Sequence, residues 1–182
     1  MSETPRDIRN IALIGFMGAG KSTVGQSVAH RLRFDFVDTD QLIEQRAGMP
    51  ISRIFETRGE AAFRELEREV VEGLAERSRT VIATGGGVGA NPDHLASLKR
   101  HALVICLWIS PEAVWQRVRN QTHRPLLQVP DPQARIRELL AARQPVYQQA
   151  DVLMNSGLRQ LPQVVQNVIH QFRLATHRSK SS

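Results

Sequence analysis

Eight residues near the start of the chain constrain its fold more than any other segment. Residues 15–22 read Gly-Phe-Met-Gly-Ala-Gly-Lys-Ser and match the pattern G-x-x-x-x-G-K-S/T of a phosphate-binding P-loop. The apolar run at 10–14 predicts a strand before the motif, and the periodicity of 21–32 predicts a helix after it. Glycines let successive backbone N–H groups turn inward, where they and the positive helix end bind phosphate. A glycine-rich turn without this role is the alternative, and the context disfavours it.

The motif also assigns roles to single residues. Lys21 can reach the β- and γ-phosphates of ATP, and the Ser22 hydroxyl can ligate Mg²⁺. We expect the nucleotide to contact Gly18, Ala19, Gly20, Lys21, Ser22 and Thr23. The P-loop indicates nucleotide binding but does not choose the reaction.

The rest of the chain alternates between apolar runs and helical patterns. Further strands are predicted at 34–37, 80–83, 103–109 and 152–154, and helices at 40–47, 59–77, after Pro92, at 111–119, 132–147 and 161–174. Such alternation predicts an α/β fold with a parallel sheet covered on both faces. Ligands of these folds bind beyond the carboxyl ends of the strands, where the unusual segments after the first three strands fall.

Length and composition set further bounds. The chain has 182 residues, so we expect one domain over 1–182, with a polar tail at about 175–182. It has no run of about 18 apolar residues and no apolar stretch typical of a signal peptide, so the cytoplasm is expected. The net charge of +6 fits a nucleic acid or anionic small substrates. Cys106, within an apolar run, is interpreted as a buried small hydrophobe.

Two carboxylates follow the second predicted strand. Asp38 and Asp40 point the same way if the chain is extended there. One could hold Mg²⁺ while the other accepts the proton of an acceptor hydroxyl. Alternatively, Asp38 only caps the following helix. The P-loop nearby favours the first interpretation.

Other segments are ambiguous alone. Arg64 shares a helical stripe with Glu60 and Glu67, which fits either a solvated ion pair or an arginine held ready for an anionic substrate. The three glycines at 85–87 form either a flexible turn or a backbone surface for a substrate. Arg124, in the polar loop, is either a surface residue or a group that closes over the phosphates.

Taken together, these segments resemble the shikimate kinase family. The resemblance covers residues 10 to about 172 and includes 15–23, 38–40, Ile54-Phe55, Gly59-Glu60, Phe63-Arg64, 85–87, 124–127 and Arg143 before Tyr147. It implies a three-layer αβα fold with a five-stranded parallel sheet, like the nucleoside monophosphate kinases, and a lid at about 119–130. It also implies an enzyme that moves the γ-phosphoryl group of ATP, with Mg²⁺, onto the 3-hydroxyl of shikimate.

The resemblance further implies specific roles. Ser22 and Asp38 would serve Mg²⁺, Asp40 would hold the substrate hydroxyl and take its proton, and Lys21 and Arg124 would stabilise the moving phosphoryl group. The shikimate-binding residues would be Asp40, Arg64, Gly85, Gly86, Gly87 and Arg143, with Phe55 and Phe63 as pocket walls. On the adenine side, the family positions fall on Arg117 and Arg159-Gln160.

Three alternatives stay open. Another small-molecule kinase, such as gluconate kinase, would share the P-loop. A nucleic-acid-binding protein would need a continuous basic face and aromatic platforms, but aromatic residues make up only 5% of the chain. An inactive nucleotide-binding scaffold is disfavoured because the lysine, serine and aspartates are all present. We therefore expect small-molecule substrates, no nucleic acid, no membrane and a monomer.

Overall fold

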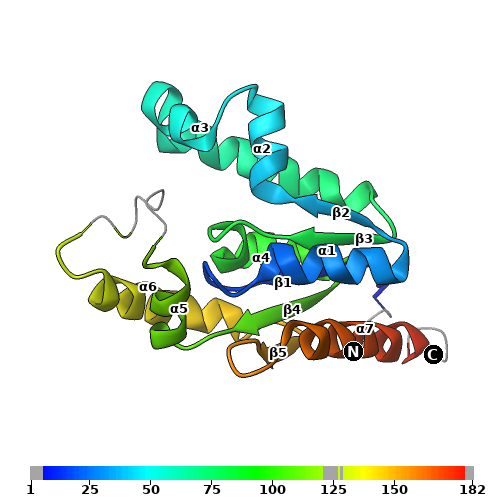
Figure 1. Cartoon of the computed structure of the whole chain (residues 1–182). Helices are drawn as coiled ribbons and strands as arrows, with labels where there is room; N and C mark the ends of the chain where they lie inside the picture. Colours follow the sequence, from blue (N-terminus) through cyan, green and yellow to red (C-terminus); the bar gives the residue numbers. More distant parts are fainter. Residues whose placement is uncertain (1–5, 121–126, 128, 179–182) are drawn as a thin grey trace.

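A five-stranded parallel sheet forms the centre of the molecule. The computed structural model describes residues 6–120, 127 and 129–178. The strand order is β2-β3-β1-β4-β5, as Figure 1 shows. The strands are β1 (Asn10–Ile14), β2 (Asp35–Asp38), β3 (Thr80–Ala83), β4 (Ala102–Trp108) and β5 (Val152–Asn155). After β3 the chain crosses from one side of β1 to the other, and such a switch point creates a ligand crevice at the carboxyl ends of the strands.

Helices cover both faces of this sheet. They are α1 (Lys21–Leu32), α2 (Thr39–Ala47), α3 (Ile51–Gly73), α4 (Pro92–Lys99), α5 (Pro111–Val118), α6 (Pro132–Tyr147) and α7 (Leu161–Arg178), with short 3₁₀ turns η1 (Leu74–Glu76) and η2 (Val88–Ala90). Helices α1 and α7 pack together in front of the sheet in Figure 1, and α4 packs against β4 from behind. The predicted three-layer αβα fold is therefore confirmed.

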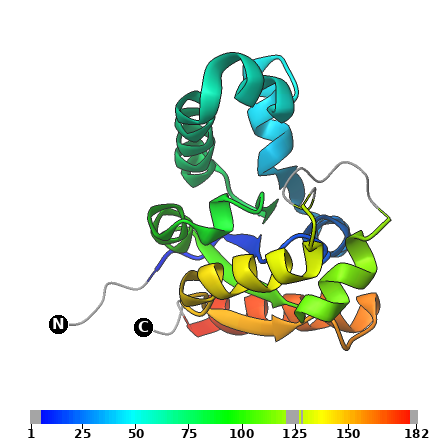
Figure 2. The ribbon, with the colours of Figure 1, turned by 90° about the vertical axis from the view of Figure 1, so that its left-hand side faces the viewer.

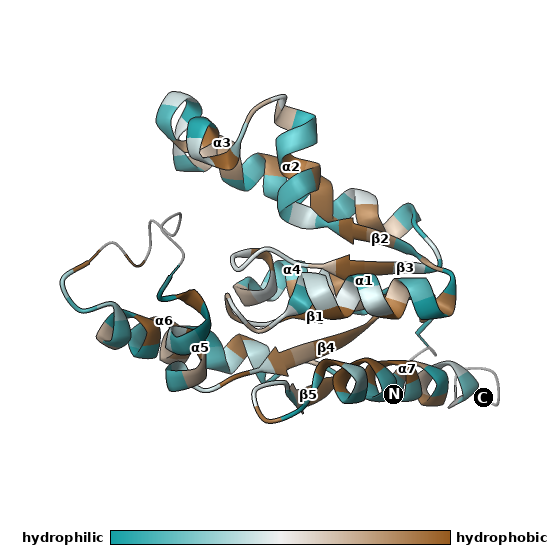
Figure 3. Cartoon of the chain, viewed as in Figure 1, coloured by the Kyte–Doolittle hydropathy of each residue, from teal (hydrophilic) through white to brown (hydrophobic). Residues whose placement is uncertain are grey.

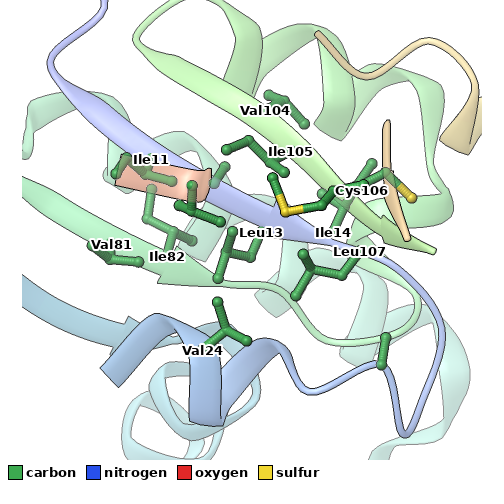
Figure 4. Close-up of a cluster of buried hydrophobic side chains, with 14 of the residues drawn as sticks. Ile11, Leu13, Ile14, Val24, Val81, Ile82, Val104, Ile105, Cys106 and Leu107 are labelled. Carbon is green, nitrogen blue, oxygen red and sulfur yellow. The ribbon is translucent and has the colours of Figure 1, made fainter. Parts of the chain in front are cut away.

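The core is made of aliphatic side chains from the central strands. Every residue of β1 and β3 is buried, and these strands are mainly brown in Figure 3. Figure 4 shows their side chains packed together, among them Ile11, Leu13, Ile82, Ile105 and Leu107. Each such side chain stabilises the fold by about 1.5–3 kcal/mol. Cys106 is part of this core, and burial raises the pKa of its thiol to about 12, so it is a structural residue as predicted.

Helices α2 and α3 form an arm beyond the β2 edge of the sheet (Figures 1 and 2). The arm has its own small core, to which Ile43 of α2 and Ile54, Phe63 and Val70 of α3 contribute. Helix α3 consists of two helical segments joined at Gly59, whose φ of 79° and ψ of 176° are not helical. The predicted helix began at Gly59, so the first segment of α3 was missed. Apolar periodicity is too short to detect over those eight residues.

Most other predicted bounds agree with the structure. The predicted span of α1 is observed, and Gly48 ends α2 with a left-handed backbone conformation. Helix α7 extends four residues beyond the predicted end. The predicted lid at 119–130 falls largely outside the described residues, as does the end of the tail. Among the residues that the structure describes, no helix is long and apolar enough to span a bilayer.

Candidate active site

The P-loop joins β1 to α1 and presents main-chain N–H groups at the helix start. Gly20 precedes α1 with a φ of 90°, a left-handed conformation that a side chain would strain. No side chain in the described part of the chain caps this helix end, and its first turn contains no acidic residue. The first N–H groups of α1 therefore remain available to an anion. Lys21 curls back over the loop, with its Nζ donating to the carbonyls of Gly15 (2.8 Å) and Phe16 (2.9 Å).

Two residues from distant segments hold the outer side of the P-loop. Arg117 of α5 donates to the Gly18 carbonyl at 2.8 Å and to the Ser156 carbonyl at 3.3 Å. The buried Ser156 hydroxyl lies 3.0 Å from the Ala19 carbonyl oxygen. Gln160, at the start of α7, is exposed, and its backbone N–H donates to its neighbour Gln163. The structure thus brings Arg117 against the P-loop next to the segment that follows β5.

Asp38 ends β2 beside the P-loop. Its Oδ2 accepts a hydrogen bond from the Ser22 hydroxyl at 3.0 Å, and its Oδ1 accepts from the backbone N–H of Asp40 at 3.0 Å. Asp38 therefore caps α2, as one interpretation expected, and also contacts the P-loop serine that the other interpretation pairs with it at Mg²⁺. A hydroxyl and a carboxylate are the hard oxygen donors that Mg²⁺ takes in small number, with water and phosphate filling its other positions. The described residues contain no cluster of three or more His, Cys, Asp or Glu that could bind a metal without such help.

Asp40 is positioned by the predicted helix, and the chain between Asp38 and Asp40 is not extended. It lies in the first turn of α2, and its carboxylate contacts the glycine loop, residues 85–87. A Cβ atom added to Gly85 would overlap Asp40 Oδ1. The neighbouring Thr39 is fully buried, and its hydroxyl accepts a hydrogen bond of 2.7 Å from the Gly85 N–H. Burial, followed by the negative charge of Asp38, raises the pKa of Asp40 from 3.8 to about 6, although Lys21 opposes the shift.

Arg64 belongs to a charged group that is only partly solvated. Its guanidinium donates to Glu60 at 3.1 Å and to Glu67 at 3.0 Å. Glu60 is largely exposed, but only 2% of Glu67 is accessible to solvent. Of the two interpretations, a merely solvated ion pair therefore does not describe Glu67. A Cβ atom on Gly87 would lie 2.9 Å from both Arg64 Nη1 and Glu67 Oε1, so this pair contacts the glycine loop.

Arg143 reaches the same loop from α6. Its guanidinium carbon lies 5.2 Å from the centre of the Phe16 ring, a distance at which a cation is attracted to an aromatic face. A Cβ atom on Gly86 would lie 3.2 Å from Arg143 Nη1. Residues 85–87 therefore have Asp40, Arg143 and Arg64 against them in turn. Their lack of side chains is what allows the three groups to approach the backbone.

Two aromatic residues lie on α3 near Arg64. The rings of Phe55 and Phe63 have their centres 4.6 Å apart, and the Arg64 guanidinium lies 5.3 Å from the centre of the Phe63 ring. Phe63 is buried in the small core of the arm, whereas Phe55 is 41% exposed. An exposed aromatic side chain beside charged groups is suited to contact a ligand with an apolar face.

Some site residues were missed and one prediction is not addressed. Arg124 lies outside the described residues. Sequence reasoning did not find Thr39 or Ser156, because a lone hydroxyl residue in a loop or cap has no distinguishing pattern. Thr39 lies between Asp38 and Asp40, and this position is the one feature of the sequence that could have suggested a role for it in the site.

The fold and the site define a class. A P-loop at the end of β1, a carboxylate at its edge and two arginines across a glycine loop are typical of a small-molecule kinase with an anionic acceptor. The family model "Shikimate kinase" matches residues 17–173. A shikimate kinase of Thermodesulfovibrio yellowstonii is 42% identical over 165 residues, which cover 91% of this chain and 95% of that protein. The chain belongs to the shikimate kinase family.

Solved structures give the same result. The shikimate kinase of Acinetobacter baumannii, in complex with shikimate, superimposes with a TM-score of 0.84 at 37% identity, covering 93% of this chain and 94% of that one. A gluconokinase of Sinorhizobium meliloti has a TM-score of 0.64 at 18% identity over 97% of this chain and 99% of that one. The second similarity shows a shared fold alone.

Proposed function

We propose that this protein is an ATP-dependent kinase that phosphorylates the 3-hydroxyl of shikimate, giving shikimate 3-phosphate and ADP for aromatic amino acid biosynthesis. The observation that carries the proposal is the convergence of Asp40, Arg64 and Arg143 on the glycine loop at 85–87. These groups provide a base and two guanidinium groups around the glycine loop. That combination matches a substrate with both a carboxylate and ring hydroxyls.

The arginines would bind the acceptor carboxylate. A guanidinium presents its donors in a planar fork that matches a carboxylate with two parallel hydrogen bonds. Arg64 is held in place by Glu60 and Glu67, and Arg143 by the face of Phe16. Backbone groups of Gly85, Gly86 and Gly87 would contact the ring hydroxyls. Phe55 and Phe63 would line the apolar side of the ring.

Asp40 would accept the proton of the attacking hydroxyl. A base works best when its pKa is close to the working pH, and the pKa of Asp40 is raised to about 6 by burial. The oxygen would then attack the γ-phosphorus in line with the leaving ADP. Lys21, released from the carbonyls of Gly15 and Phe16, would follow the negative charge of the moving phosphoryl group.

Ser22 and Asp38 would hold Mg²⁺, Asp38 through a water molecule. Their side-chain oxygens are 3.0 Å apart beside the P-loop, so a single ion with its water shell would face both. When bound, Mg²⁺ neutralises charge on the β- and γ-phosphates. The amides of residues 18–23 would hold those phosphates.

The nucleotide base and the lid complete the site. Arg117 and Gln160 would flank the adenine, since Arg117 joins the P-loop to the segment after β5. We infer that Arg124 and the lid at 119–130 close over the phosphates and exclude water, which limits wasteful ATP hydrolysis.

The proposal is tested by ADP release with different acceptors. Purified protein with Mg·ATP should release ADP rapidly with shikimate, and only at background rate with gluconate, nucleoside monophosphates or no acceptor. Phosphorylation of gluconate at a comparable rate would favour the other small-molecule kinase. Salt-sensitive retention on DNA or RNA would revive a nucleic-acid role.

A further inference from the structure

A buried histidine faces the acid that holds Arg64. His94 lies in the first turn of α4, and 8% of its surface is accessible to solvent. Its Nδ1 atom is 3.9 Å from Glu67 Oε2, too far for a hydrogen bond. Among the residues that the structure describes, this Nδ1 has no hydrogen-bond partner. The ring also borders a cleft of about 570 Å³ between α3 and α4, which Arg64 and Glu67 line as well.

Glu67 depends on the few groups around it. As an almost fully buried carboxylate it is costly unless compensated. The glycine loop packs against its Oε1 side, while Arg64 donates to Oε2. His94 approaches that same Oε2 from α4. A shift of about 1 Å between α3 and α4 side chains would bring Nδ1 and Oε2 within hydrogen-bond distance.

Acceptor binding changes which carboxylates receive the hydrogen bonds of Arg64. In the unliganded arrangement the guanidinium serves Glu60 and Glu67 at once. A bound carboxylate would take some of those donors and share their positive charge. Glu60 is exposed and regains water when released, but Glu67 cannot. Another buried donor is then needed beside Glu67, and His94 is the group positioned to provide it.

We propose that His94 is a positioning residue for acceptor binding, donating its Nδ1–H to Glu67 when Arg64 turns its own donors toward the acceptor carboxylate. The inference rests on the proposed function for the identity of that acid. The neutral ring suffices for this role, and burial lowers the pKa of His94, so the ring is neutral near pH 7. Glu67, Glu72 and Arg64 of α3 and the adjacent Asp93 are the charged groups that act on it.

Three substitutions separate positioning from packing. An asparagine amide places its N–H close to where Nδ1 lies, a glutamine amide places it further out, and leucine fills the space without a donor. We expect His94→Leu and His94→Gln to raise the KM for shikimate about three- to tenfold, the range for one hydrogen bond of ordinary strength. His94→Asn should stay within about twofold of the wild type. The KM for ATP should be unchanged in all three.

Ser97→Ala is the matched control. Ser97 is also buried on α4 and borders the same cleft, but it bonds to Arg100 and not to Glu67. Its removal should leave the KM for shikimate unaltered. Melting of the unliganded proteins should change little for His94→Leu, since Nδ1 makes no hydrogen bond before the acceptor binds. Equal KM values for the Asn and Gln variants, or a parallel rise in the KM of both substrates, would overturn the proposal.

Turnover of shikimate by the wild-type protein tests the proposed function and not the role of His94. If a different organic acid proves to be the acceptor, the ratio of variant to wild-type KM is measured with that acid, and the His94 result is read in the same way. A wild-type enzyme with no preference for carboxylates would contradict the role of Arg64 and, with it, that of His94.

Discussion

The cradle for the phosphates comes from one continuous segment, the P-loop, whereas the acceptor side is assembled from α2, α3, α6 and the loop after β3. The P-loop uses main-chain amides anchored between two buried elements, β1 and α1. The acceptor side uses charged side chains whose positions depend on one another and on a separate small core. The P-loop therefore holds its phosphate-binding amides in fixed positions, whereas the side chains of the acceptor side can rearrange around a ligand. Loss of a group that acts on the moving phosphoryl group or on the attacking hydroxyl should therefore reduce turnover, whereas loss of a group that only holds one substrate should mainly raise the KM for that substrate.

The strongest test of this contrast is Lys21→Ala. The variant removes the cation that accompanies the phosphoryl group, and we expect kcat to fall about 10³-fold. The fold should survive, because Lys21 is not part of the hydrophobic core. Coupled ADP assays and circular dichroism measure the two effects. Lys99→Ala, at a cation that pairs with Asp151 away from the site, serves as the control and should keep its activity.

Asp40→Asn should have the next largest effect. It removes the proposed base while keeping nearly the same shape, so kcat should fall about 10²-fold or more. In the wild type, kcat/KM should decline as pH falls through about 6, because protonation at the raised pKa removes the base. A wild-type profile that stays flat down to pH 5 would contradict this role.

The same residue should also reveal a cost in stability. The native pKa of Asp40 is raised, so the native state binds this proton more tightly than the unfolded state. The penalty for the ionised form is complete above about pH 6 and disappears below about 3.8. Asp40→Asn should therefore raise the free energy of unfolding at pH 8, by at most about 3 kcal/mol, and much less at pH 4. Urea unfolding at both pH values gives the comparison.

Arg64→Ala tests the acceptor side. We expect the KM for shikimate to rise about 10- to 100-fold, because a bidentate pair to a charged group is lost, while the KM for ATP changes little. The variant should also lose stability, since it leaves Glu67 buried without its cation. Arg68→Ala is the matched control: Arg68 lies one turn further along α3 and pairs with the exposed Glu65 and Glu72. An equal loss for both substrates in Arg64→Ala would remove the distinction between the two sides.

The two sides also differ in how far sequence predicts them. The P-loop is contiguous, and the strand and helix around it follow from local hydrophobic patterns, so its position could be predicted from residues 10–32 alone. Arg64 could be chosen only in combination with other segments. The burial of Glu67 could not be predicted, because helical spacing puts it beside Arg64 but does not reveal that α4 and the glycine loop enclose it.

Backbone geometry limits prediction in a similar way. The interpretation of Asp38 and Asp40 assumed an extended chain, whereas α2 starts between them and turns Asp40 toward Gly85. The choice of residues was the same, but the reason was different. Likewise, the glycines at 85–87 suggested either flexibility or access, and only the structure identifies the three side chains that lie against them.

Ser156 offers the smallest and most specific test, because it belongs to the phosphate side but acts from outside the P-loop. Its hydroxyl lies 3.0 Å from the Ala19 carbonyl and 3.2 Å from the Trp108 carbonyl, so it ties the loop to the end of β4. Ser156→Ala should cost about 1 kcal/mol of unfolding free energy and raise the KM for ATP about two- to fivefold, without affecting the KM for shikimate. Ser110→Ala, which removes the cap of α5 at a comparable cost in stability, is the control and should leave both KM values unchanged. If Ser156→Ala instead weakened shikimate binding, the two sides would share a support, and the separation between a fixed phosphate cradle and an adaptable acceptor side would not hold.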